Sequence, residues 1–70
     1  MYKARMEVDM ERLKALRKEQ VLTLRELAEL SGVSKDSISR IERTGMARQT
    51  TIRKLAAGLG VEARELIKKN

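Results

Sequence analysis

Hydrophobic residues recur along much of the chain at steps of three and four, which is the spacing of amphipathic helices. The chain has no proline and no alternating run of β-branched residues, so we expect helices and no strands. The first helix is predicted to begin after Asp9, whose carboxylate can cap it. Its buried face is formed by Met10, Leu13 and Leu16.

The second predicted helix begins at Thr23. Glu26 follows three residues later and completes a capping box, in which each side chain accepts a hydrogen bond from the backbone amide of the other residue. The helix ends at Gly32, because glycine adopts the left-handed backbone conformation without the penalty of a β-carbon. Its buried face is formed by Leu27, Ala28 and Ser31.

The third predicted helix is capped by Ser34 and ends by residues 44–45. Its only inward residues are Ile38 and Ile41. Val33 would fill the angle between the second and third helices, and the small Ala28 would let them cross closely. Residues 23–43 are therefore predicted to form a helix-turn-helix, which holds its second helix out for the major groove of DNA. Structural helical hairpins share this pattern, so the motif alone does not decide the function.

The remaining sequence predicts two more helices. After a loop, Thr50 or Thr51 caps a fourth helix that ends at Gly60, and Val61 leads into a last helix. The inward residues are Ile52, Leu55, Ala56 and Leu59 in the fourth helix, and Leu66 and Ile67 in the last one. The predicted fold class is therefore all-α, a compact five-helix domain over residues 9–70.

The charge of the chain favours a polyanionic partner. There are 16 Lys plus Arg against 10 Asp plus Glu, which gives a formal net charge of +6 and a pI of about 10.2. A small protein can also be basic for solubility alone. Residues 1–8 are expected to form an N-terminal arm, in which Lys3 and Arg5 either follow a nucleic-acid backbone or lie in a disordered segment.

Missing residue types exclude several kinds of chemistry. Without histidine and cysteine there is no Ser–His or Cys–His pair, no disulfide, and no histidine or thiolate zinc site. The four glycines form no phosphate-binding loop, and most acids lie near basic residues. We therefore expect no enzyme, no catalytic residue, no metal and no cofactor. No apolar segment is long enough to span a membrane.

The segments RLKALRKEQ, LTLRELAELSGVSKDSISRIER and IRKLAAGLGVEARELI are similar to successive parts of one family. It is the Cro/lambda-repressor type, or xenobiotic-response-element (XRE) family, of bacterial and phage regulators. The resemblance runs from about residue 10 to residue 67. It implies a compact five-helix domain that binds double-stranded DNA, usually as a homodimer on a palindromic operator.

The resemblance also assigns roles to individual residues. The positions that match those contacting base edges are Lys35, Asp36, Ser37 and Arg40. Arg40 could bind guanine bidentately, at a cost of about 1–3 kcal/mol if the base is changed. Arg17 and Glu42 match a pair that commonly clamps the recognition helix, residues 34–43, to the scaffold. The alternative is a surface ion pair worth about 0–1 kcal/mol.

Asp36 is an acid among bases, and three interpretations are open. It could accept a hydrogen bond from a cytosine amino group. It could pair with Arg40, four residues later on the same helix face, and orient that side chain. It could also repel phosphates when the protein sits in a wrong register. The spacing favours the pairing with Arg40.

Phosphate contacts are expected on both sides of the recognition helix, because helix starts present free N–H groups to anions. The candidates are Thr23, Arg43, Arg48, Gln49 and Thr50. One departure from the family pattern is Val21, which stands where glycine often ends the first helix. We therefore expect a turn of another shape at this position.

The function expected from these features is a sequence-specific repressor in a bacterial or phage-infected cytoplasm, associated with the nucleoid. A homodimer is expected, because one small domain would cover only one half-site of a palindromic operator. Ile67 is the candidate for the dimer interface, and the alternative is that Ile67 belongs to the core. Two other functions stay open. One is an antitoxin that binds a toxin and represses its own gene, and the other is a protein-interaction module without DNA binding.

Overall fold

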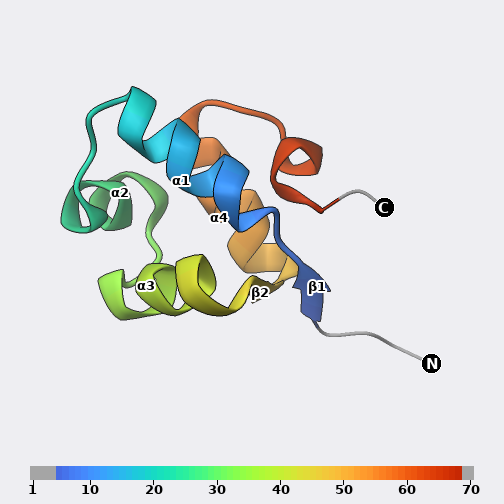
Figure 1. Cartoon of the computed structure of the whole chain (residues 1–70). Coiled ribbons are helices and arrows are strands. Elements are labelled where there is room, and N and C mark those ends of the chain that lie inside the picture. Colours follow the sequence, from blue (N-terminus) through green and yellow to red (C-terminus); the bar gives the residue numbers. More distant parts are fainter. Residues whose placement is uncertain (1–4, 69–70) are drawn as a thin grey trace.

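The computed structural model describes residues 5–68 (Figure 1). The elements follow the order β1 (Arg5–Glu7), α1 (Met10–Glu19), α2 (Leu24–Ser31), α3 (Lys35–Thr44), β2 (Met46–Arg48), α4 (Gln49–Leu59) and a 3₁₀ turn, η1 (Ala63–Leu66). Within this range four of the predicted helices are confirmed as α-helices. No helix of the described part is long and apolar enough to cross a membrane.

One hydrophobic core joins the elements. Its buried residues are Val8, Leu13, Leu16, Leu27, Val33, Ile38, Ile41, Ala47, Ile52, Leu55, Ala56, Leu59 and Leu66. The predicted inner faces are largely confirmed, although the residues Met10, Ala28, Ser31 and Ile67 are only partly buried. Val8 and Ala47 belong to no predicted element, yet they are 2% and 6% exposed. Both are buried because the chain is paired there as extended backbone.

Two short strands form a sheet that the expectation of helices alone missed. β1 and β2 pair antiparallel, with Met6 opposite Ala47 and Arg5 opposite Arg48. Met6 and Ala47 pack on the core, whereas Arg5 and Arg48 are exposed. The prediction of no strands is wrong, because three residues per strand are too few for an alternating pattern to stand out.

The predicted N-terminal arm of residues 1–8 lies only partly within the described residues. Lys3 falls outside them. From Arg5 onward the segment is β1, and the amide of Val8 then donates to the Gly45 carbonyl (2.7 Å). This part of the chain is therefore built into the domain.

The chain after α4 forms a short turn and an extended segment where a fifth α-helix was predicted. Ile67 follows η1 in extended conformation and pairs with Val8 in an antiparallel bridge. The amide of Asp9 donates to the Leu66 carbonyl at 2.8 Å. The prediction of a helix that carries Ile67 is wrong, because pairing with the segment before α1 holds the backbone extended there.

An ion pair at the surface fastens η1 to α1. Arg12 Nη2 lies 3.0 Å from Glu65 Oε1, and the two side chains are 44% and 38% exposed. The hydrogen bond from Arg12 holds the pKa of Glu65 below its usual value. Solvent reaches both groups, so this contact is screened.

α1 ends in a turn of the kind that usually contains glycine. Val21 has φ 55°, in the left-handed region. Its amide donates to the Lys18 carbonyl (2.9 Å) and the Leu22 amide donates to the Arg17 carbonyl (3.0 Å), the two bonds of a Schellman motif. The expectation of a turn of another shape is therefore wrong. The Val21 side chain is 84% exposed, so little packing offsets a conformational cost of about 1–2 kcal/mol.

α2 and α4 approach each other closely at Gly58. A β-carbon on Gly58 would lie 2.9 Å from the Ser31 Cβ, so the two backbones leave no room for a side chain. The Ser31 hydroxyl donates to the Leu27 carbonyl (2.7 Å) and accepts from the Val33 amide (3.2 Å). The residue that packs against α4 therefore also shapes the turn into α3.

We expect Val21→Gly to stabilise the domain by about 1 kcal/mol, because relief of the left-handed conformation outweighs the added freedom of glycine in the unfolded chain. Thermal unfolding followed by circular dichroism should then show a Tm higher by about 4–8 °C. Val21→Ala is the matched control, since it keeps the β-carbon and should gain less. An unchanged Tm in the glycine variant would show that the turn is unstrained.

Candidate nucleic-acid interface

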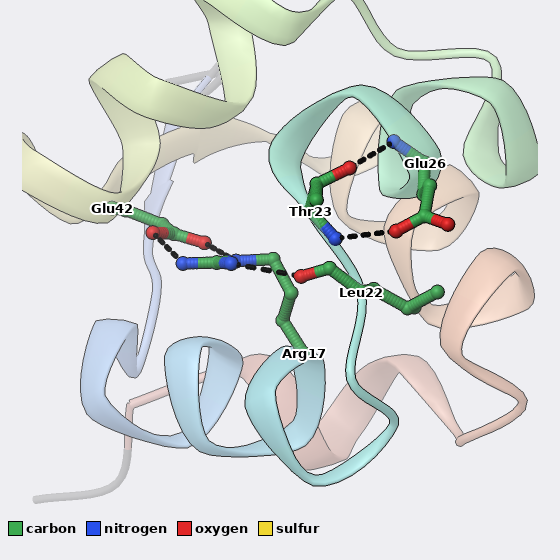
Figure 2. A network of polar contacts seen from close by, with 5 residues as sticks. All are labelled: Arg17, Leu22, Thr23, Glu26 and Glu42. Carbon is green, nitrogen blue, oxygen red and sulfur yellow. Dashed lines mark hydrogen bonds and ion pairs between the residues drawn. The ribbon is translucent and has the colours of Figure 1, made fainter.

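α2 and α3 form the predicted helix-turn-helix, and side chains cap the start of each helix. Thr23 Oγ1 accepts from the Glu26 amide (3.0 Å), while Glu26 Oε1 accepts from the Thr23 amide (2.8 Å), as Figure 2 shows. The bond from the Thr23 amide holds the pKa of Glu26 below its usual value. Gly32 ends α2 with φ 76°, and Ser34 Oγ accepts from the Ser37 amide (3.2 Å) at the start of α3. The predicted capping box, glycine end and serine cap are confirmed.

The inner side of α3 contains two isoleucines and one acid. Ile38 and Ile41 are 0% and 4% exposed, as predicted. Glu42 is also buried, at 9% exposure. The prediction that Ile38 and Ile41 are the only inward residues is therefore wrong, because the Glu42 carboxylate has a partner that makes its burial tolerable.

That partner is Arg17 of α1, the residue that the family resemblance pairs with Glu42. Arg17 Nε donates to Glu42 Oε2 (2.8 Å) and Nη2 donates to Oε1 (3.1 Å), with the side chains only 15% and 10% exposed. Arg17 Nη1 also donates to the Leu22 carbonyl (2.9 Å). In Figure 2 the guanidinium lies between these two acceptors. One side chain thus connects α1, the segment that leads into α2, and the last turn of α3.

The residues predicted to contact bases lie on the outer side of α3. Lys35, Asp36 and Arg40 are exposed and Ser37 is half-buried. Ser37 Oγ accepts from Ser34 Oγ (2.9 Å), which leaves the Ser37 hydroxyl proton available to a ligand. Among residues 5–68 no ion pair joins Asp36 to Arg40. The interpretation that Asp36 orients Arg40 therefore stays a prediction.

The residues predicted to contact phosphate are all exposed and lie around α3. They are Thr23, Arg43, Arg48, Gln49 and Thr50. Arg48 occupies the cap position of α4 and makes no side-chain hydrogen bond to its first turn. The prediction that Thr50 or Thr51 caps this helix is wrong, because β2 leads directly into α4 and both threonines already lie in its first turn.

The sheet brings one more basic residue to this side of the molecule. Arg5 lies opposite Arg48 and lines a groove together with Arg48 and Arg40. Figure 1 shows β1 and β2 beside the carboxyl end of α3. From the sequence, Arg5 is expected either to follow a nucleic-acid backbone or to lie in a disordered segment. Polar and apolar residues alternate over 5–8, but this pattern is too short to predict a strand by itself.

Ile67, the predicted dimer contact, lies elsewhere. It is partly buried against the core beside Val8. In Figure 1 this end of the chain is on the opposite side of the molecule from the start of α3. A contact through Ile67 would therefore leave the outer face of α3 uncovered.

Comparison of the sequence with known proteins finds a family and a curated relative that are similar to most of the chain. The family described as Helix-turn-helix matches residues 13–66. The HTH-type transcriptional repressor RghR of Bacillus subtilis (strain 168) is 49% identical over 53 residues, which cover 73% of this chain and 39% of RghR. The chain thus spans less than half the length of this curated relative. No solved structure matches the chain significantly.

The family match covers most of the chain and includes α2, the glycine turn and α3. These are the elements that carry the capping box, the buried isoleucines and the polar outer face. The chain therefore belongs to the XRE-type helix-turn-helix family of DNA-binding transcriptional regulators.

Proposed function

We propose that the domain binds a specific double-stranded DNA sequence through α3 and represses transcription. The observation that carries the proposal is the polar outer side of α3, where Lys35 and Arg40 are exposed and have no ion-pair partner among the described residues. The helix would enter the major groove with its amino end first. We propose repression because the relative RghR is named a transcriptional repressor. Since DNA is the proposed partner, we propose that the protein acts in the cytoplasm, with the nucleoid, of a bacterium or an infected cell.

We further propose a homodimer on a palindromic operator. One copy of so small a domain would cover one half-site, and two copies related by a two-fold axis match a palindrome. Ile67 is the proposed contact between the copies, because part of its apolar side chain remains at the surface. A two-fold symmetric consensus among DNA sites selected from random duplexes would support the dimer.

Selection of binding sites from random duplexes should enrich a palindrome whose half-sites are about one helical turn apart. Arg40→Ala should keep the palindrome but abolish guanine preference at one position in each half-site, a reduction of about 1–3 kcal/mol in discrimination. Arg64→Ala is the matched control, because it removes the same charge from an exposed residue of η1 and should leave the consensus unchanged. No enrichment by the unchanged protein would refute specific DNA binding and favour the interaction module.

We expect Asp36→Ala to alter base preference more than affinity for nonspecific DNA. If Asp36 orients Arg40 through its charge, Asp36→Asn should change the selected consensus as much as the alanine variant does. If Asp36 accepts from cytosine, the asparagine variant should keep part of the preference, because its amide oxygen is still an acceptor. The same consensus for all three proteins would show that Asp36 has no part in recognition.

We propose that the ion pair of Arg17 and Glu42 clamps α3 to α1. A double-mutant cycle of Arg17→Met and Glu42→Gln, measured by urea unfolding, should give a coupling energy of about 1–3 kcal/mol, because the bidentate contact is largely shielded from water. The pair Arg12 and Glu65 is the internal control and should couple less, since it has one contact and is more exposed. A coupling energy near zero for Arg17 and Glu42 would remove the clamp.

A further inference from the structure

The two strands place two arginines directly opposite each other. Arg5 and Arg48 are register partners, and both are exposed while Met6 and Ala47 beside them face the core. Side chains of directly opposed residues lie on the same face of the sheet, and like charges in this arrangement are destabilising. The two opposed positive charges cost stability in the free protein. An anion between the two guanidinium groups would make this arrangement favourable.

The same two arginines line a groove with a third one. Arg5, Arg40 and Arg48 line a groove of about 490 Å³, together with Ser37, Thr44, Thr51 and apolar residues of α3 and β2. None of the described residues that line it is acidic. Among residues 5–68 none of the three arginines has a carboxylate within ion-pair distance. The groove is therefore positively charged.

The start of α4 adds backbone donors beside this groove. Arg48 occupies the cap position of α4, and its side chain accepts no hydrogen bond from the first turn. Thr51, in that first turn, lines the groove. The first amides of a helix have no partner within the helix, and the helix dipole favours negative charge at this end. Arginines and free amides at one place are the donor set that binds a phosphate.

We propose that this groove binds a phosphate of the DNA backbone and that Arg5, supplied by β1, is a DNA contact. The proposal rests on the proposed function, and it extends the interface from the helix-turn-helix to the N-terminal strand. The groove runs along α3 from Ser37, in its first turn, to Thr44, and Arg5 and Arg48 line it from the two strands. Arg40 lies on the side of the groove that is proposed to contact bases, so the phosphate is assigned to Arg5 and Arg48, beside the carboxyl end of the helix (Figure 1).

Arg5→Gln tests this assignment, because glutamine keeps most of the length and removes the charge. Affinity for a nonspecific duplex of about 20 base pairs should fall roughly tenfold, and the slope of log K against log salt should become shallower by about 0.9 for each phosphate that the variant no longer neutralises. Thermal stability should stay the same or rise, since the repulsion between Arg5 and Arg48 is relieved. A merely structural role of Arg5 would lower stability and leave the salt slope unchanged.

Arg64→Gln is the matched control, because it removes one positive charge from η1, on the far side of the domain from α3 (Figure 1). Its salt slope should equal that of the unchanged protein. If Arg5→Gln and Arg64→Gln have the same affinity and slope, Arg5 is no DNA contact, although the proposed DNA binding stands. If the unchanged protein binds no duplex, both the proposed function and this inference are wrong.

Discussion

We propose that the placement of α3 depends on the buried ion pair of Arg17 and Glu42. The outer side of α3 is polar and largely exposed, so this helix offers only a narrow apolar face, with Ile38 and Ile41, to the core. Two isoleucines hold a helix against the core but leave its rotation loosely defined. A bidentate contact fixes both the distance and the relative orientation of the guanidinium and the carboxylate, and so of the helices that carry them. Because the Glu42 carboxylate is buried, removal of Arg17 would leave an uncompensated charge that strongly destabilises the domain.

The two ends of α3 are fixed by different means. At its amino end Ser31 packs on α4, binds the Val33 amide, and so sets the turn that precedes the helix. At its carboxyl end Glu42 is followed within a few residues by β2, which pairs with β1. The N-terminal strand is therefore linked through β2 to the end of α3, and it also carries Arg5, the proposed DNA contact. Residues on the far side of α3, with no part in its packing, are left to contact a ligand.

What the sequence predicted correctly was determined locally. Thr23 and Glu26 satisfy each other's amides within one helical turn, and Gly32 ends its helix by its own backbone freedom. The outer face of α3 follows from helical periodicity once Ile38 is inward. The strand at Arg5 could not be predicted in this way, because its partner Arg48 is far along the chain and three residues leave a weak pattern.

Of the other differences between the predicted and the observed structure, one comes from a long-range contact and one from a local turn. Ile67 extends beside Val8 where a helix was expected, because the segment before α1 offers backbone partners that a sequence window around Ile67 does not contain. Val21 keeps the Schellman turn without glycine, since the two hydrogen bonds and the position of Leu22 fix the backbone there. The Leu22 carbonyl then accepts from Arg17, so this unfavourable residue lies next to the contact that places α3.

The net charge of +6 says little by itself, because the acids and bases are distributed unequally. Several acids bind within the scaffold, as Glu42 does with Arg17, Glu65 with Arg12, and Glu26 with the Thr23 amide. Among the described residues the bases around α3 have no such partners. Asp36 is the exception on this basic surface. In the proposed complex with DNA its charge would weaken the attraction to phosphates of any sequence, so a larger share of the binding energy would come from contacts that distinguish bases.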